Sequence, residues 1–436
     1  MTLERDDPEL AGALAADARG QRDTLALVAH ASLAHPSVLA AAGAALNNVT
    51  AEGYPGARYH PGAAWFDVVE RLAVRRAKAA FGARYANVQP HSCSSANLSA
   101  LVGLLPPGGV LLGMDLDAGG HLTHGSAASV TGTHFRAVGY GVDAAGRVDY
   151  DQVADLARRH RPGVVVAGAS AHPRALDYRR FREIADSVGA YLLADISHVA
   201  GLVVAGEHPS PIDTAHVTTT STYKQLGGPR GGLILIGAEH RAPAPDGTTT
   251  LAGLMQRSVF PRTQGTPNPG AIAAKARALD LAGRAEFREW ARRVVADAAA
   301  LAARLSRLGH RVLTGGTDTH MVVLDLRPRG VTGVVAERAL EECGILANRN
   351  RVTGDDRPPL VASGLRLGTN VVARRGMGPG EAEECADLVD AVLRAVRPLD
   401  DRRYDLDPEV RDRVRARVAW LCAEFPVPFE LSEVPA

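Results

Sequence analysis

The sequence is poor in cysteine, and the cysteines that it has lie far apart. Its 436 residues include four of them, Cys93, Cys343, Cys385 and Cys422, and no two form a CxxC pair. This spacing argues against a disulfide framework and against a structural zinc site. The cytoplasm is therefore the expected compartment, and we expect no metal.

The sequence also lacks a charge excess and a long hydrophobic run. Its 49 basic and 48 acidic residues leave a formal net charge of +1, so no overall basic field favours nucleic acid or an anionic membrane surface. The first residues are acidic and polar, unlike a signal peptide, and no uninterrupted run of about 20 apolar residues occurs. These absences predict small or zwitterionic partners, with no nucleic acid and no membrane.

Short apolar runs alternate with helical patterns through the middle of the chain. Hydrophobic residues make up 46% of the sequence, enough to bury a large core, and the length suggests two or three domains. Segments with helical spacing lie between the apolar runs and end at Pro162 or Gly189. Predicted strands, several of them apolar on both faces, cover residues 109–115, 135–141, 163–170, 190–197, 216–222 and 231–237. Strands of this kind are usually buried in a parallel sheet, so the predicted fold class is α/β.

A long helical segment follows these strands and leads to a second set of strands and helices. We interpret this second set as a smaller domain. The predicted division is an N-terminal arm (1–45), a large domain (46–275) and a small C-terminal domain (276–436).

Reactive side chains follow two of the predicted strands, where open parallel sheets bind their ligands. Asp195 ends one strand and is followed by His198, and Lys224 follows another. An aspartate and a lysine at strand ends could be a plain ion pair. Here, however, the lysine stands between Ser221 and Thr222 and the glycine-rich turn GGPRGG, whose hydroxyl and N–H groups can hold a phosphate while the amine forms a Schiff base.

One cofactor needs all three of these features. Pyridoxal 5'-phosphate requires a lysine for its aldehyde, an anion cradle, and a carboxylate that keeps its ring nitrogen protonated. A second candidate for the cradle is HSCSSAN (91–97), which opens a helical run, because a helix N-terminus favours phosphate.

Eight segments distributed over the chain carry a resemblance to a known family. They are AEGYPGARY (51–59), YANVQPHS (85–92), GGHLTHGS (119–126), REIADSVGAYLLAD (182–195), HVAGLVVAGEHPSP (198–211), KQLGGPRGGLIL (224–235), GGTDTH (315–320) and SGLRLGT (363–369). In these segments, which occur in family order and at family spacing, the chain resembles the serine hydroxymethyltransferases, fold-type I enzymes that depend on pyridoxal phosphate, over nearly its whole length. The resemblance implies a large domain with a mainly parallel seven-stranded sheet and a smaller C-terminal α/β domain.

The resemblance implies roles at the cofactor for residues that match the motifs. Lys224 would form the Schiff base, Asp195 would pair with the ring nitrogen, and His198 would lie beside the ring hydroxyl. His121 would stack on the ring. Tyr223, directly before the lysine in the sequence, would also belong to the site. The remaining cofactor residues would be Ser92, Cys93 and Ser94 at the phosphate, Ser170 near the ring edge, Ser221, and Arg262 and Thr263 from a partner subunit.

At the substrate, the resemblance implies that Arg366 takes the amino-acid carboxylate, because a planar guanidinium matches two oxygens. Glu52 would be the acid–base group, with Tyr59 in the same segment. In the family this segment reaches the neighbouring subunit's site, so the active unit would be an obligate homodimer, and two dimers could form a tetramer.

Several positions depart from the family pattern. The family has Ser-Glu, Tyr, Tyr and His at the positions of His30-Ala31, Thr50, His60 and Tyr223, and it has paired glycines at Arg262 and Thr263. The changes at His30, Thr50 and His60 would alter the amino-acid end of the pocket and leave the cofactor end intact. Neutral drift and an altered substrate are both open explanations.

The implied reaction is retro-aldol cleavage of a small β-hydroxy amino acid, with transfer of the hydroxymethyl group to tetrahydrofolate. Leu116, Leu122 and Asn350 match family positions that contact the folate. Thr50 in place of tyrosine opens space beside the α-carbon, as an α-methylserine hydroxymethyltransferase or a folate-independent threonine transaldolase would need. A regulatory or RNA-binding relative without turnover is a third alternative, but such a relative would be expected to lack the lysine or the carboxylate.

Overall fold

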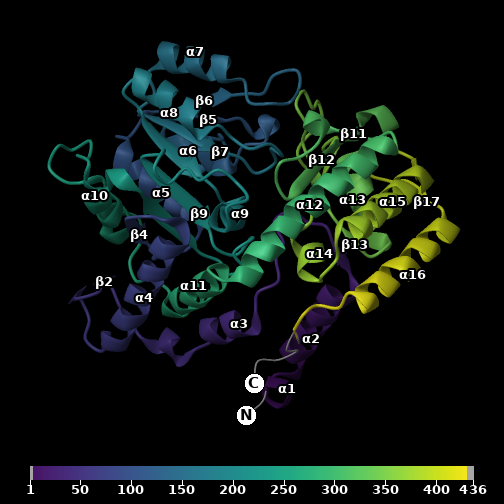
Figure 1. The fold of residues 1–436 in the computed structure, drawn as a ribbon, viewed down its shortest axis with the longest axis horizontal. Coiled ribbons are helices and arrows are strands. Elements are labelled where there is room, and N and C mark those ends of the chain that lie inside the picture. The colour runs from purple at the N-terminus through teal and green to yellow at the C-terminus, as the bar shows by residue number, and fades with distance from the viewer. Residues whose placement is uncertain (1–2, 430–436) are drawn as a thin grey trace. The chain divides into compact units, whose positions relative to one another are not determined.

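The computed structural model describes residues 3–429. The chain divides into two compact units (Figure 1), one made of Ser37–Ala291 and the other of Met1–Pro36 together with Arg292–Ala436. The predicted domain boundaries, after residues 45 and 275, stay a prediction. Each unit contains its own sheet and its own hydrophobic core.

A seven-stranded sheet forms the centre of the Ser37–Ala291 unit, in the order β4-β10-β9-β8-β7-β5-β6. Neighbours from β9 to β6 are parallel, whereas β10 runs antiparallel to both β9 and β4. This confirms the predicted mainly parallel sheet. The strands are β4 (Tyr85–Asn87), β5 (Val110–Met114), β6 (Arg136–Tyr140), β7 (Val164–Gly168), β8 (Tyr191–Asp195), β9 (Val217–Ser221) and β10 (Gly232–Ile236).

Helices cover both faces of this sheet, which is why its central strands are apolar on both sides. Val164 and Val166 of β7 share a buried cluster with Ala96 and Leu101 of α5, while Val165, between them, is buried on the opposite face. The helices of this unit are α3 (Pro36–Ala42), α4 (Ala64–Phe81), α5 (Cys93–Leu104), α6 (Val130–His134), α7 (Tyr150–His160), α8 (Tyr178–Ser187), α9 (Ala200–Ala205), α10 (Leu251–Arg257) and α11 (Pro269–Ala282).

The long helical segment predicted after residue 270 is two helices instead of one. α11 ends at Ala282, and α12 (Ala285–Arg307) begins three residues later. Gly283 caps the end of α11, and glycine is among the weakest helix formers. The break ends α11 inside the Ser37–Ala291 unit, where it packs against α4.

The second unit joins the two ends of the chain. β1 (Leu25–Ala26) pairs in parallel with β13 (Ile345–Leu346). A second sheet has the order β11-β12-β15-β14, with β11 (Arg311–Val312), β12 (Met321–Asp325), β15 (Gly364–Gly368) and β14 (Asn348–Asn350). The remaining elements of this unit are the helices α1 (Leu3–Asp6), α2 (Pro8–Asp23), α13 (Gly333–Glu342), α14 (Asn370–Arg374), α15 (Pro379–Ala395) and α16 (Pro408–Glu424), and the hairpin strands β16 (Val396–Pro398) and β17 (Tyr404–Leu406).

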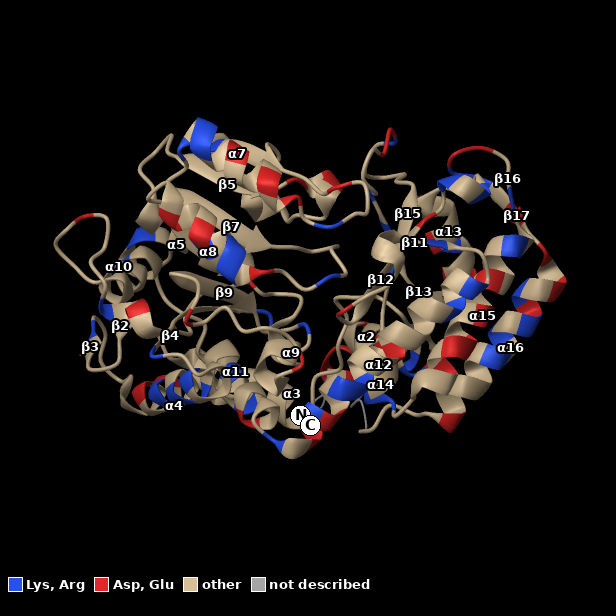
Figure 2. Cartoon of the chain, turned by 45° about the horizontal axis from the view of Figure 1, so that its top comes forward, with Lys and Arg blue, Asp and Glu red and all other residues tan. Residues whose placement is uncertain are grey.

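Charge and cysteine follow the expectations from composition. Acidic and basic residues are interspersed along helices such as α4 and α16 (Figure 2), in keeping with the net charge of +1. All four cysteines are buried and free. None of the helices within residues 3–429 combines the length and the apolar character that a membrane span needs.

Candidate functional site

A cavity of about 190 Å³ opens at the carboxyl ends of the central strands, as expected for an open parallel sheet. Asp195 is the last residue of β8, Ser170 follows β7, and Lys224 follows β9. The structure therefore brings together most of the predicted cofactor residues. Those that line this cavity are Ser92, Cys93, Ser94, His121, Ser170, Asp195, His198, Ser221, Tyr223 and Lys224.

The carboxylate of Asp195 is buried and accepts hydrogen bonds from several side chains. His124 Nε2 lies 3.0 Å and Asn97 Nδ2 lies 2.8 Å from Oδ2, and Ser197 Oγ lies 2.6 Å from Oδ1. Burial raises the pKa of Asp195, but hydrogen bonds from His124 and Ser197 outweigh burial and hold the pKa well below its usual range. Asp195 is therefore an anion throughout the physiological pH range.

Three residues around Asp195, namely His124, Asn97 and Ser197, were missed by sequence reasoning. Thr219 Oγ1 donates to Asn97 Oδ1 over 2.5 Å, which turns the amide nitrogen toward the carboxylate. His124 stands inside the matched motif GGHLTHGS, and Asn97 ends HSCSSAN, the segment predicted as a second candidate for the phosphate cradle. Their position in these motifs was the available signal, but the partner of each side chain comes from a distant part of the sequence.

A short helical turn, η3 (Leu122–His124), places two histidines beside the cavity. The backbone N–H of His121 donates to His124 Nδ1 over 3.2 Å, so His124 carries its proton on Nε2 and donates it to Asp195. Burial lowers the pKa of His121 to about 4, although the charge of Asp195 opposes this shift. His121 is therefore neutral at pH 7, a state suited to stacking on an aromatic ring.

The ligand atoms of His121, His124 and Asp195 lie within 4.8 Å of one another, close enough to hold a metal ion. The hydrogen bond between His124 and Asp195 accounts for this approach without a metal.

Lys224 lies in a tight turn after β9. Its side chain is 8% exposed, and within residues 3–429 we find no hydrogen-bond acceptor for its ammonium. The ammonium lies 5.4 Å from the centre of the Tyr223 ring. The guanidinium carbon of Arg230 lies over the same ring, 4.3 Å from its centre. The backbone of Gly228 donates to Thr222 and closes the turn. A buried amine in a cavity that also contains a carboxylate fits the aldehyde of pyridoxal phosphate.

The N-terminus of α5 lines the same cavity. Ser92 caps this 12-residue helix, and its hydroxyl accepts from the backbone N–H of Ser95. Ser92, Cys93 and Ser94 line the cavity beside the exposed Arg230. Free N–H groups and the positive end of the helix dipole make this end suitable for a phosphate.

Cys93 is buried in this region, 3.6 Å from Asp195 Oδ1. Burial and the charge of Asp195 raise the pKa of its thiol well above the usual value. It is therefore a neutral thiol, unsuited to act as a nucleophile.

The structure does not bring Glu52, Tyr59, His60 and Thr50 into the Lys224 cavity. Glu52 Oε2 lies 3.5 Å from His60 Nε2, and both side chains are partly open to solvent. The Tyr59 side chain is 72% exposed, and Thr50 is also exposed.

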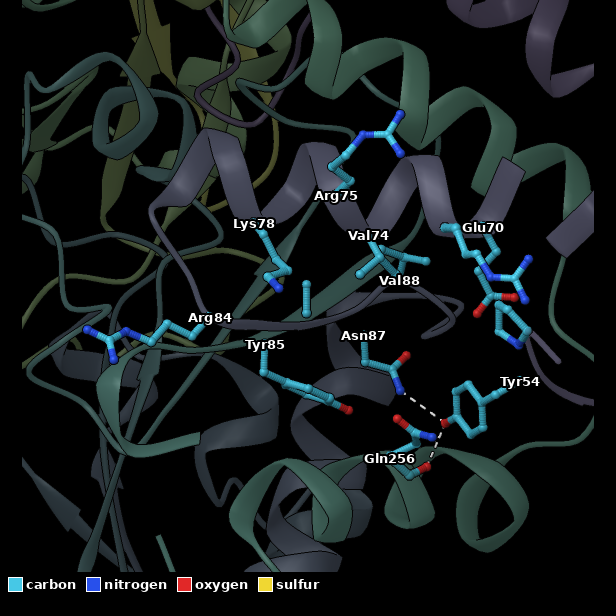
Figure 3. A pocket seen from close by; sticks show the side chains of 13 residues that line it. Tyr54, Glu70, Val74, Arg75, Lys78, Arg84, Tyr85, Asn87, Val88 and Gln256 are labelled. Atoms are coloured by element: carbon cyan, nitrogen blue, oxygen red, sulfur yellow. Dashed lines mark hydrogen bonds between the residues drawn. The ribbon is translucent and has the colours of Figure 1, made fainter. Parts of the chain in front are cut away.

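The hairpin that follows Glu52, β2 (Gly53–Tyr54) and β3 (Ala57–Arg58), is firmly held at its base. Arg58 donates to Asp67 and Glu70 of α4 and to the carbonyl of Gly53. Tyr54 Oη donates to the Gln256 carbonyl over 2.6 Å and accepts from Asn87 over 3.0 Å (Figure 3). Tyr54 lines a separate cavity of about 480 Å³, whose lining also includes Lys78 of α4 (Figure 3).

Arg262 and Thr263 also lie outside the Lys224 cavity. They end the helical segment η5 (Ser258–Thr263). Arg262 Nη1 donates to the Val102 carbonyl over 3.2 Å, and Thr263 Oγ1 lies 2.7 Å from Ser99 Oγ. Both contacts fix this segment to α5, and Arg262 is exposed.

In the other unit, Arg366 of β15 lies beside His30. Its Nη2 is 3.1 Å from His30 Nδ1, and its Nε donates to Asn348 Oδ1 over 3.2 Å. Arg366 is only 7% exposed, so it is no ordinary surface cation. Asn350 lies on the neighbouring strand β14, where its Nδ2 donates to the Arg351 carbonyl.

Leu116 and Leu122 are exposed, at 41% and 47%. Leu116 also lines a cavity of about 430 Å³ that shares His121 and His124 with the Lys224 cavity.

Comparisons with known proteins agree with this geometry. Residues 3–389 match the family model described as serine hydroxymethyltransferase. A serine hydroxymethyltransferase of Synechococcus sp. (strain JA-3-3Ab) is 46% identical over 438 residues, covering 98% of this chain and 96% of that protein. A serine hydroxymethyltransferase of Ruegeria pomeroyi is also 46% identical, over 426 residues, with the same coverage of 98% and 96%. The chain belongs to the serine hydroxymethyltransferase family.

Proposed function

We propose that this protein transfers a hydroxymethyl group between a small β-hydroxy amino acid such as serine and tetrahydrofolate, with pyridoxal 5'-phosphate as cofactor. The observation that carries this proposal is the buried amine of Lys224 in one cavity with the anionic carboxylate of Asp195. Membership of the family gives the reaction class.

The residues of the cavity fit the cofactor. When bound, pyridoxal phosphate supplies an electron sink for the bond that breaks at the α-carbon. Lys224 would hold its aldehyde, Asp195 would keep its ring nitrogen protonated, and the neutral His121 would stack on the ring. The N-terminus of α5, with Ser92 and Ser94, would hold the phosphate.

Arg366 would bind the carboxylate of the amino acid, because a buried guanidinium with a planar fork suits this task. His30 stands 3.1 Å from that guanidinium and would orient it or contact the same carboxylate. Leu116, Leu122 and Asn350 would contact the folate. The exposure of two leucines beside His121 supports a planar apolar partner at that place.

The active unit would be a homodimer with shared sites. Glu52, the proposed acid–base group, and Tyr59 and His60 beside it lie on an open segment outside the cavity of their own chain. A second copy would use them to complete its own site, with Arg262 and Thr263 near its phosphate. The cytoplasm stays the expected compartment, because the four cysteines are free.

The test is an assay of folate dependence. Purified protein reconstituted with pyridoxal phosphate is incubated with serine, and glycine is measured with and without tetrahydrofolate. We expect glycine to form much faster with tetrahydrofolate than without it. We expect Lys224→Ala to lose the absorption of the lysine-bound cofactor. Cleavage of threonine with transfer to an added aldehyde, without folate, would contradict the proposal and favour the transaldolase. A reconstituted wild type without bound-cofactor absorption would exclude both reactions.

A further inference from the structure

A second lysine is buried close to the cofactor cavity and has no role in the function proposed so far. Of the 49 lysines and arginines in the sequence only three are lysines, Lys78, Lys224 and Lys275. Lys275 lies in α11 and is 1% exposed. A chain that otherwise uses arginine for its cations therefore has lysine at this buried position.

Within the described residues, the hydrogen-bond partners of the Lys275 ammonium are backbone carbonyls. Its Nζ donates to Val88 over 2.7 Å, to Pro90 over 2.9 Å and to Gly232 over 3.0 Å. Its three N–H donors thus match three acceptors. The planar guanidinium of arginine could not point its donors at three converging carbonyls in this way, which explains the choice of lysine.

These carbonyls belong to the two segments that lead to the cofactor cavity. Val88 and Pro90 lie between β4 and the N-cap of α5, Ser92, whereas Gly232 begins β10 directly after the turn that contains Lys224 and Arg230. The two segments also bond to each other, because the backbone of Gly232 donates to the Pro90 carbonyl over 2.9 Å. Lys275 therefore joins the phosphate end of the cavity to the lysine turn.

The paired glycines at the end of GGPRGG make this junction possible. A Cβ at Gly231 would overlap Cε of Lys275, and a Cβ at Gly232 would overlap the carbonyl oxygen of Ser92. Gly231 thus makes room for the lysine, and Gly232 makes room for the capped start of α5.

The charge of Lys275 is not neutralised by a bonded carboxylate. Its three hydrogen-bond partners in the described chain are neutral carbonyls, while Glu70 is occupied by Arg58 and Gln89. Burial lowers the pKa of Lys275 to about 7, with the charge of Glu70 opposing the shift. An anion at the N-terminus of α5 would stabilise such a cation, and the cation would stabilise the anion.

We propose that Lys275 is a positioning residue for the cofactor's phosphate: its ammonium fixes the segment before α5 against the lysine turn and makes this end of the cavity selective for a phosphate dianion. This inference rests on the proposed function, because it takes pyridoxal phosphate as the ligand. It assigns to Lys275 no contact with the substrate and no part in proton transfer.

The test compares two ligands that differ only in the phosphate. Apo-protein with Lys275→Met is titrated with pyridoxal phosphate and with pyridoxal, and the dissociation constants are read from the absorption of bound ligand. We expect at least a tenfold loss of affinity for pyridoxal phosphate and a loss below about threefold for pyridoxal. A charge–charge interaction strong enough to shift a pKa by about one unit changes a dissociation constant about tenfold when it is lost. Lys78→Met, a lysine that lines the separate cavity of Figure 3, is the matched control and should change neither constant.

A second variant covers the case in which Lys275→Met does not fold. Gly231→Ala retains the lysine but displaces its side chain, and it should reduce the preference for the phosphate ligand in the same direction. Equal losses for both ligands, or no loss in either variant, would overturn the inference and leave Lys275 a purely structural group. If the wild type itself binds neither ligand, the proposed function fails instead, so the two failures are distinguishable.

Discussion

The charge of Asp195 depends on its neighbours, and this dependence can be tested at a single residue. His124→Phe removes one of the two donors on Oδ2 and leaves Asn97 as the other, which raises the pKa of Asp195. We expect turnover to fall about tenfold to a hundredfold, as is typical when a side chain that orients a group of the reacting centre is removed, and the acidic limb of the pH–rate profile to move to higher pH. His124→Gln, which can still donate, should retain most of the activity. An unchanged acidic limb in His124→Phe would mean that Asn97 and Ser197 suffice.

Asp297 is a buried carboxyl group in α12, and neither of its oxygens has a hydrogen-bond partner in the described chain. Burial raises its pKa to about 7; Arg293 opposes this shift and Glu381 adds to it. Because the pKa of this carboxyl group is higher in the folded protein than in the unfolded chain, the unfolded chain loses the proton at lower pH. The free energy of unfolding therefore falls as pH rises from about 4 to 7. Asp297→Asn should therefore raise the midpoint of thermal unfolding at pH 8 by several degrees and change it little at pH 4.5. Glu286→Gln, an exposed change in the same helix, is the control; an equal gain at both pH values would contradict the assignment.

Sequence reasoning located Lys224 and Asp195 because strand ends in a parallel sheet meet at one edge. It could not locate Asn97, His124 or Lys275, because their partners are distant in the sequence and become neighbours only in the folded chain. The interaction between Lys275 and the Val88 carbonyl, for example, joins residues 187 positions apart. Hydrogen bonds of this kind leave no local pattern of hydrophobicity or turn residues.

At the scale of elements, the β2–β3 hairpin shows how the segment after Glu52, proposed above to take part in catalysis, is held in place by a buried ion pair. Arg58 bonds Glu70, which is 2% exposed and whose pKa is raised by burial despite this bond. Arg58→Met would leave Glu70 buried without its charged partner, although Gln89 still donates to it, and the loss of such a partner typically costs about 3–5 kcal/mol. We expect unfolding at a temperature lower by roughly 10 °C.

We also expect faster proteolytic cleavage within residues 51–60 of Arg58→Met and a loss of activity larger than the loss of folded protein. Arg71→Met removes an arginine of α4 that makes only a longer contact, 3.4 Å, to Asp67, and serves as the comparison. Intact hairpin protection in Arg58→Met would show that Tyr54 alone anchors the hairpin.

The six predicted strands are all present, each shorter by a residue or more at its ends. These strands could be predicted because each contains a run of β-branched or aliphatic residues. β4 was not predicted, because its three residues are too few for a pattern. The break between α11 and α12 was also missed, since a single glycine in a helical pattern is often tolerated.

At the scale of the whole molecule, the proposed sharing of sites predicts complementation between inactive variants. Glu52→Gln and Lys224→Ala are each expected to be inactive. If each site takes Glu52 from one chain and Lys224 from the other, mixing equal amounts with subunit exchange should restore about a quarter of the wild-type activity, because half of the dimers would be mixed and each would have one intact site. A mixture as inactive as its components, with exchange verified by mass spectrometry, would place both residues in one chain's site.

The pairing of β1 with β13 has a consequence for synthesis of the chain. Leu25 pairs with Ile345, which is synthesised much later. The first strand therefore leaves the ribosome long before its partner strand exists. At about 5–20 residues per second, this delay is roughly a quarter of a minute to a minute. The sheet around Lys224 can form during this interval, while the amino-terminal strand is still without its partner, and a nascent chain that stops before residue 345 would leave Leu25 and Leu27 without part of their core.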